Sequence, residues 1–186
     1  MSEKTAVLNR KNLAKQTFYR WQRELARFKD ESITDPLTGL LNRRGFDKML
    51  QDYYSIAQRT DNVLKIIFID ADKFKKINEN SGYQIGDLAL KIIAEGIKKT
   101  FQRITDIKAR WGGDEFIVIS LNKPDDKSSG VEKLSNKLNK AITELRLSKI
   151  SNNVLITVTL GITIWNRQDS VEDLMKKVEN QMHQRK

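Results

Sequence analysis

Two apolar segments, residues 104–109 and 116–121, are separated by the short string RWGGDE at residues 110–115. Apolar segments joined by two glycines predict a β-hairpin, because tight hairpin turns need the positive φ that glycine adopts without a Cβ clash. The bare backbone of Gly112 and Gly113 would also let a phosphate group lie close to it. The rest of the chain must build a sheet around this hairpin, so the string constrains the fold strongly.

Two adjacent carboxylates, Asp114 and Glu115, follow the glycines directly. Carboxylate oxygens beside a phosphate-sized gap suit Mg²⁺, which prefers hard oxygen ligands shared between protein and nucleotide. Taken alone, GGDE is also compatible with an ordinary surface turn, because tetrapeptides match by accident.

A second pair of carboxylates ends an apolar run at residues 63–69, which is typical of a central strand buried on both faces. Asp70 and Asp72 are two residues apart, so an extended chain places them on the same side of the strand end. Two like charges there are unfavourable unless water or a cation neutralises them. Alternatively, Asp72 caps the helix that follows.

The remaining chain alternates helix and strand patterns. A turn around Pro36 and Gly39 precedes them. Apolar residues at helical spacing predict helices over residues 43–59, 87–101, 131–147 and 171–184, and β-branched residues predict a strand over 154–165.

Residues 1–32 contain neither Gly nor Pro and are predicted to form one basic helix. Phe18, Trp21, Leu25 and Phe28 follow the 3-4-3 spacing of a coiled-coil seam. The same stripe would suit a helix that packs on its own domain, and the pattern leaves both arrangements open.

Composition limits the class of partner. The 186 residues suit one domain with an appendage, and 34 Lys and Arg against 24 Asp and Glu give a net charge of +10. This charge favours polyanions such as nucleotides, nucleic acid or an acidic membrane surface. The chain has no Cys and one His, which excludes thiolate sites and His clusters. No membrane span or signal peptide is predicted, so we expect a cytoplasmic protein.

Four strings in this order resemble the motifs of the GGDEF family, the diguanylate cyclases: DPLTGLLNRR, DADKFKKINENSGYQIGD, RWGGDEF and TVTLGI. The resemblance covers residues 33–186. It implies an α+β fold with a palm-like, ferredoxin-like sheet of the nucleotidyl-cyclase type, antiparallel in part, with flanking helices. Residues 1–32 would precede this GGDEF domain as a signalling or dimerisation helix. The first string looks structural, a turn stabilised by ion pairs.

The resemblance also implies the site. Asp70, the carbonyl of Ala71 and Asp114 would bind Mg²⁺ or Mn²⁺, and Asp114 or Glu115 would accept a proton. Asn78 and Asp87 would bind the guanine of GTP, because their side chains match its donors and acceptors. The other substrate contacts implied are Phe74, Lys75, Gly112, Gly113, Tyr83 and Lys186. The resemblance places Tyr83 where the family usually has His.

The implied activity is the joining of two GTP molecules into cyclic di-GMP by a homodimer. Arg103 and Asp106 occupy the register of the family's inhibitory product site, although Arg-x-x-Asp alone is usually a solvated ion pair. Two alternatives remain: a GGDEF module that binds GTP or cyclic di-GMP without turnover, and a nucleic-acid-binding protein suggested by charge. No nucleic-acid recognition motif accompanies that charge, so nucleic acid is not expected as a partner. The chain lacks the family's Gly-Arg-Asn and final strand.

Overall fold

The computed structural model describes residues 32–123, 130–150 and 154–184. Its centre is a four-stranded sheet with strand order β2-β3-β1-β4. β1 (Val63–Ala71) pairs antiparallel with β3 (Glu115–Asn122) on one side and with β4 (Val158–Ile164) on the other. β2 (Ile107–Arg110) pairs antiparallel with β3. The predicted hairpin is therefore β2 and β3, at one side of the sheet.

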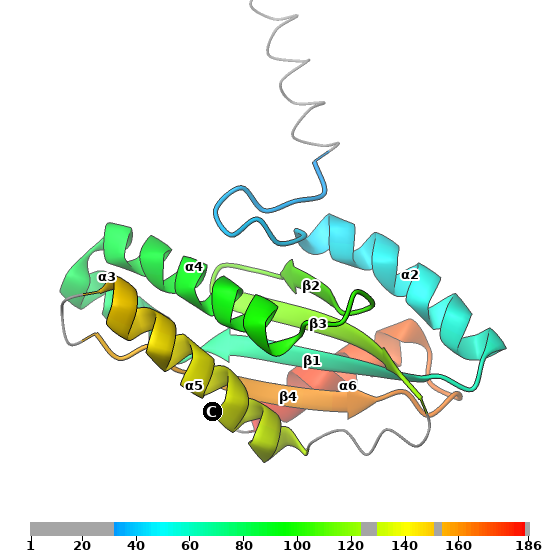
Figure 1. The fold of residues 1–186 in the computed structure, drawn as a ribbon. Helices are drawn as coiled ribbons and strands as arrows, with labels where there is room; N and C mark the ends of the chain where they lie inside the picture. The colour runs from blue at the N-terminus through cyan, green and yellow to red at the C-terminus, as the bar shows by residue number, and fades with distance from the viewer. Residues whose placement is uncertain (1–31, 124–129, 151–153, 185–186) are drawn as a thin grey trace, which may run out of the picture. The chain divides into compact units, whose positions relative to one another are not determined.

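Two helical crossovers complete the topology (Figure 1). α3 (Phe74–Ser81) and α4 (Tyr83–Thr100) connect β1 to β2, and α5 (Val131–Lys149) connects β3 to β4. α2 (Arg43–Arg59) precedes β1, and α6 (Val171–His183) follows β4. This order and strand arrangement confirm the predicted ferredoxin-like α+β fold.

Both faces of the sheet are buried. Ile67 and Ile69 of β1 belong to a core cluster with α4 and α5, whereas Ile66 and Phe68 belong to a second cluster with α2. Side chains alternate between the faces of a strand, so one continuous apolar run supplies both clusters. The prediction that residues 63–69 form a strand buried on both faces is confirmed.

Three predicted boundaries were wrong. α4 begins at Tyr83 and not at residue 87, because Gly82 adopts φ 83° and ends α3 one residue before α4 begins. β2 begins at Ile107 and not at residue 104, because the Asp106 carboxylate accepts the Arg103 N–H at 3.1 Å and closes a turn there. β4 begins at Val158 and not at residue 154, since its ladder with β1 starts at the Ala71–Val158 pair.

Asp35 organises the turn that precedes α2. Its Oδ1 accepts hydrogen bonds from the Thr38 N–H at 2.9 Å and the Thr38 hydroxyl at 2.6 Å. Its Oδ2 forms an ion pair with Arg110 at 3.2 Å, and Gly39 adopts φ 65°. The predicted turn stabilised by ion pairs is confirmed.

This turn is also joined to the sheet. The Leu41 N–H donates to the Lys108 carbonyl at 3.2 Å, and the Arg110 N–H donates to the Leu41 carbonyl at 2.8 Å. Leu41 therefore runs beside β2 as a short parallel bridge with Ala109. The predicted N-terminal helix, residues 1–32, lies outside the described residues except for Ser32. Residues 33–186 form one compact unit, and none of its described helices is long and apolar enough to cross a membrane.

We predict a pH-dependent contribution of Asp35 to stability. Burial is the largest influence and acts to raise the pKa of Asp35, but the Thr38 hydrogen bonds and Arg110 together lower it below its ordinary value. A lowered folded pKa gives stability that is present above the unfolded pKa of about 3.9 and is lost as pH falls through the folded pKa. The difference in melting temperature between wild type and Asp35→Asn should therefore be larger at neutral pH than below about pH 3.

Asp52→Asn, which changes an exposed carboxylate of α2, is the matched control and should show a smaller difference at neutral pH. A difference for Asp35→Asn that is equal at neutral and acid pH would contradict this assignment.

Candidate functional site

The pairing of β1 with β3 brings the predicted carboxylates together. Asp70 lies opposite Glu115 in the strand ladder, and the Ala71 N–H donates to the Asp114 carbonyl at 3.1 Å. Asp70 is only 3% exposed, whereas Asp114 and Glu115 are half-buried. The end of β1 and the start of β3 therefore form one acidic edge, built from two separate motifs of the sequence.

This edge can offer a metal ion few protein ligands. Within the described ranges, no three His, Cys, Asp or Glu side chains gather in an arrangement that would hold a metal. The predicted set consists of two carboxylates, Asp70 and Asp114, and the Ala71 carbonyl. Mg²⁺ usually keeps water and substrate phosphate among its ligands, so a small set of hard oxygens suits it.

The loop between β2 and β3 differs from the predicted tight turn. Gly112 and Gly113 are not among the described residues with positive φ, so the expectation of positive φ there was wrong. The loop spans residues 111–114, and the Trp111 and Gly112 N–H groups both donate to the Glu115 carbonyl, at 2.8 and 3.3 Å. A wider loop does not need the φ angles of a two-residue turn.

The two glycines serve different purposes in this loop. A Cβ on Gly112 would lie 2.7 Å from Oε2 of Glu115, so the absence of a side chain makes room for that carboxylate. A Cβ on Gly113 would meet nothing within 4 Å, so its backbone faces open space. The predicted approach of a ligand to the bare backbone is thus sterically available at Gly113.

Arg110 holds the tip of the loop, a role that the sequence analysis missed. Its guanidinium donates from Nε and Nη2 to the Gly113 carbonyl, at 3.1 and 2.6 Å, and from Nη1 to the Asp35 carboxylate. One side chain therefore connects the turn before α2 with the residue preceding Asp114. The planar fork of arginine makes such a two-sided contact, which a lysine would not reproduce.

Trp111 fixes the other side of the loop. Its ring packs edge-on against Phe46 and Phe68, with centroids 5.4 and 6.3 Å apart, and the Arg43 guanidinium lies 4.3 Å from its centroid. These contacts come from α2 and β1 and lie in the second core cluster. The position of Trp111 directly before the glycines was the available sequence signal for this anchor.

α3 begins immediately beyond β1. Phe74 and Lys75, two of the implied substrate contacts, are its first residues, and the N-cap residue Lys73 provides no side-chain hydrogen bond. The alternative that Asp72 caps this helix was wrong, because the Asp72 carboxylate accepts the hydroxyls of Thr157 and Thr159 at 2.7 and 2.6 Å. Lys75 pairs with Glu79 at 3.8 Å on the exposed surface.

The predicted base-binding residues lie at the junction of α3 and α4. A Cβ on Gly86 would lie 1.9 Å from Oδ1 of Asn78, so the Asn78 carboxamide occupies space that any other residue at position 86 would need. Tyr83 and Asp87 are four residues apart on α4 and thus share a helix face; both are exposed, Tyr83 to 81%. The junction of α3 and α4 therefore carries all three of these residues, on two consecutive helices.

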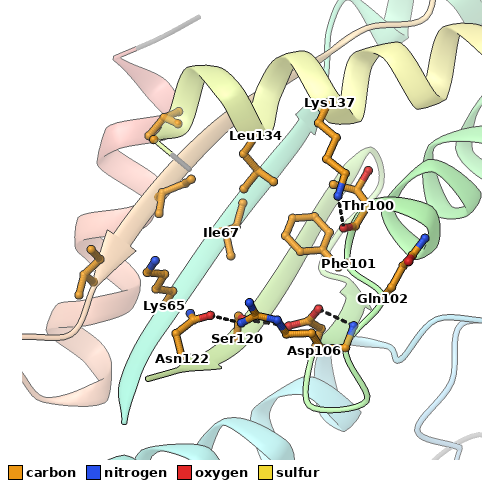
Figure 2. A pocket seen from close by; sticks show the side chains of 15 residues that line it. Lys65, Ile67, Thr100, Phe101, Gln102, Asp106, Ser120, Asn122, Leu134 and Lys137 are labelled. Carbon is orange, nitrogen blue, oxygen red and sulfur yellow. Dashed lines mark hydrogen bonds between the residues drawn. The ribbon is translucent and has the colours of Figure 1, made fainter. Parts of the chain in front are cut away.

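Arg103 and Asp106 line a different feature, a cavity of about 450 Å³ (Figure 2). Asp106 is 6% exposed and accepts the Ser120 hydroxyl at 2.8 Å as well as the Arg103 N–H. Arg103 is exposed, and its guanidinium donates to Asn122. The cavity floor is apolar, with Ile67, Phe101 and Leu134 among its residues. It lies at the end of β3 away from the glycine loop. Lys186, the last predicted contact, lies outside the described residues.

Comparisons with known proteins support the motifs. The sequence profile of the family described as "Diguanylate cyclase, GGDEF domain" matches residues 32–186. The chain is 29% identical over 181 residues to diguanylate cyclase DgcP of Pseudomonas aeruginosa, covering 97% of this chain and 26% of that protein. It is 40% identical over 109 residues to diguanylate cyclase DgcP of Escherichia coli, covering 58% of this chain and 32% of that protein. The chain thus spans less than a third of either relative.

The fold has close counterparts among solved structures. The coiled coil and GGDEF domain of DgcB from Caulobacter crescentus, solved with c-di-GMP, matches with a TM-score of 0.66 at 22% identity. The match covers 96% of this chain and 93% of that one. At this identity the likeness concerns the fold, which is the nucleotidyl-cyclase palm.

We predict that Gly86 leaves the space that the Asn78 carboxamide needs, because it has no Cβ. Gly86→Ala should displace the Asn78 carboxamide and weaken the binding of a GTP analogue by about 3- to 10-fold, as expected for the loss of one hydrogen bond. If both substitutions act through the same group, the double variant Gly86→Ala/Asn78→Ala should bind no more weakly than Asn78→Ala alone.

Calorimetric titration measures all three variants. Gly130→Ala is the control, because a Cβ there would meet nothing within 4 Å, and its affinity should equal that of wild type. Additive losses in the double variant would show that Gly86 acts independently of Asn78.

Proposed function

Because the chain belongs to the GGDEF domain family over residues 32–186, we propose that it is a cytoplasmic diguanylate cyclase. It would condense two GTP molecules into cyclic di-GMP and two pyrophosphates. The observation that carries the proposal is the acidic edge, where the register of β1 and β3 sets Asp70 against the Asp114-Glu115 pair. The names of both DgcP relatives support the same activity.

We assign the metal to this edge. Asp70, the Ala71 carbonyl and Asp114 would hold Mg²⁺ or Mn²⁺, which would neutralise phosphate charge and favour ionisation of the attacking 3′-hydroxyl. Glu115 or Asp114 then serves as the proton acceptor. The Glu115 carboxylate extends over Gly112, next to Gly113, where the open space would let the nucleotide approach.

The substrate contacts divide between two places. Guanine would bind at the α3–α4 junction through Asn78, Asp87 and Tyr83, because a carboxylate and a carboxamide complement its donor and acceptor edge. The phosphates would lie between the start of α3, at Phe74 and Lys75, and the Gly112-Gly113 backbone, where N–H groups attract anions. Lys186 would add a charge to this phosphate site.

The reaction requires two chains. Each domain offers one GTP half-site, so two must face each other to close the cyclic product, and residues 1–32 would promote this by pairing as a coiled coil. A coiled coil accompanies the GGDEF domain in the DgcB structure.

Activity per molecule should rise with enzyme concentration, and deletion of residues 1–32 should shift that rise to higher concentration. Activity per molecule that changes neither with enzyme concentration nor on deletion of residues 1–32 would contradict a role of this segment in dimerisation.

The central prediction concerns the carboxylates. Asp70→Asn and Asp114→Asn keep the side-chain shape but remove the charge, so each should lower cyclic di-GMP synthesis by about 100-fold or more. Their melting temperatures should stay close to that of wild type. The assay is incubation with GTP and Mg²⁺, with Asp61→Asn, whose side chain is 99% exposed, as the control.

Two results would contradict this assignment. Unchanged activity in both Asn variants would exclude these carboxylates from the chemistry. A wild-type protein that binds GTP or cyclic di-GMP without turnover would instead be a regulatory binding module.

We further propose product inhibition through Arg103. The Asp106 carboxylate accepts Ser120 and the Arg103 N–H, so it shapes the loop, and the Arg103 guanidinium, which donates to Asn122 at the cavity, is the group that would contact a ligand. The cavity lies at the end of β3 remote from the glycine loop, so a ligand there would act without occupying the substrate site.

Arg103→Ala should therefore weaken cyclic di-GMP binding by about 10-fold or more, because a charge-assisted hydrogen bond is lost, while kcat stays unchanged. Calorimetric titration and inhibition assays measure both quantities. Thr105→Ala, in the same exposed loop, is the control. Equal affinity of wild type and Arg103→Ala would reduce the Arg-x-x-Asp string to a structural turn.

A further inference from the structure

The connection from β1 to α3 contains an unusual backbone conformation. Lys73 adopts φ 55° and ψ 30°, the left-handed region, which costs a residue with a Cβ on the order of 1 kcal/mol. This single residue turns the chain from the strand into the helix. A conformation of this kind persists only where neighbouring contacts hold it.

Asp72 supplies such contacts. Its carboxylate accepts the Thr157 hydroxyl on Oδ2 at 2.7 Å and the Thr159 hydroxyl on Oδ1 at 2.6 Å, and its N–H donates to the Thr157 carbonyl at 2.9 Å. Three hydrogen bonds thus join the residue before Lys73 to the start of β4. We call Asp72, Thr157 and Thr159 the carboxylate clamp.

The start of β4 is itself fixed from its other edge. The Asn139 carboxamide of α5 accepts the Val158 N–H at 2.9 Å and donates to the Val158 carbonyl at 3.0 Å. Two bonds from α5 therefore hold the segment to which the clamp is attached. Loss of the clamp should free α3 while leaving β4 in place.

The first turn of α3 has one further contact, since the half-buried Phe74 packs against the main core cluster. Ile77 is the one buried residue of α3, and a cavity of about 670 Å³ lies along its side, lined by Lys73, Lys76, Asn80 and the clamp residues among others. The far end of α3 is fixed by Gly82 and by the contact between Asn78 and Gly86. The position of its N-terminus therefore depends on the clamp together with the packing of Phe74, and only the clamp holds the backbone of residues 72 and 73 by hydrogen bonds from its side chains.

That N-terminus carries donors without helical acceptors. The Lys76 N–H already donates to the Lys73 carbonyl at 2.9 Å, whereas the first two N–H groups of a helix, here those of Phe74 and Lys75, have no acceptor within it. Lys73 has no side-chain oxygen that could cap them. Their direction is set by the backbone of residues 72 and 73.

We infer that Asp72 is a positioning residue, which fixes the first turn of α3 for the phosphates of GTP through Thr157 and Thr159. This inference rests on the proposed function and specifies how the fold prepares the phosphate site. It gives Asp72 a role that is neither metal ligand nor helix cap. Because N–H groups bind phosphates in the ground state and the transition state alike, their misplacement should raise KM more than it lowers kcat.

The test is removal of the clamp hydroxyls without loss of volume. Thr157→Val/Thr159→Val should raise the KM for GTP by about 10-fold with kcat changed by less than about 3-fold, as expected when charge-assisted hydrogen bonds are lost outside the reacting centre. Thr157→Ser/Thr159→Ser, which keeps both hydroxyls, should restore KM. Thr163→Val is the matched control on β4, because its buried hydroxyl has no hydrogen-bond partner within the described residues.

Hydrogen exchange provides a second readout. Exchange of the α3 amides should rise in the Val pair, while the strand amides of β1 and β4 keep their protection. If the Val pair fails to fold, the single variant Thr159→Val replaces it. A KM equal to that of Thr163→Val, with unchanged exchange in α3, would overturn the inference.

Failure of the proposed function is distinguishable from failure of the clamp. An inactive wild type would contradict the cyclase proposal, and a titration with a non-hydrolysable GTP analogue would then decide the clamp alone. Weaker binding by the Val pair, restored in the Ser pair, supports it; equal binding by wild type and the Val pair overturns it.

Discussion

The register between β1 and β3 is the constraint on which the site depends. Ile66–Ile69 lie opposite Phe116–Ile119, an apolar block with polar pairs at both ends: Lys65 opposite Ser120, and Asp70 opposite Glu115. A slip of one residue would reverse the face of every side chain in β1. Because both faces of β1 are apolar, the register must be selected by the polar pairs at the two ends of the apolar block and by the shapes of the two core clusters. The same selection places the carboxylates side by side.

The loop that carries Asp114 is held by elements outside the hairpin. Arg110 connects the Gly113 carbonyl to Asp35, and Trp111 contacts the Arg43 guanidinium and the rings of two phenylalanines. Asp35 and Arg43 lie on either side of the short segment that bonds to β2 through Leu41. A change in the position of this segment would therefore act on the loop through a polar contact and an aromatic one. Gly113 therefore keeps open space beside it, while the residues around the loop hold its position.

The sequence predicted those features that depend on periodicity or on a long motif. The apolar run of β1 and the amphipathic pattern of α2 agree with the structure, and the motif order implied the fold. Errors occurred where a single side chain decides the backbone. The Asp106 carboxylate closes a turn where the sequence predicted a longer β2. Gly112 was predicted to supply a positive φ but instead leaves room for the Glu115 carboxylate. Asp72 was also misjudged, because its threonine partners lie more than 80 residues away in sequence.

The acidic edge departs from the rules that the rest of the fold obeys. A carboxylate that is 3% exposed and lies opposite another in a strand pair must be compensated by its surroundings, because burial of a charged group costs free energy. The sheet sustains this cost through the apolar pairs next to it, where Ile69 and Phe116 are fully buried. Such local conflicts with folding are expected at functional sites. The proposed divalent cation would place an opposite charge beside both carboxylates, which is the compensation that a buried acidic pair requires.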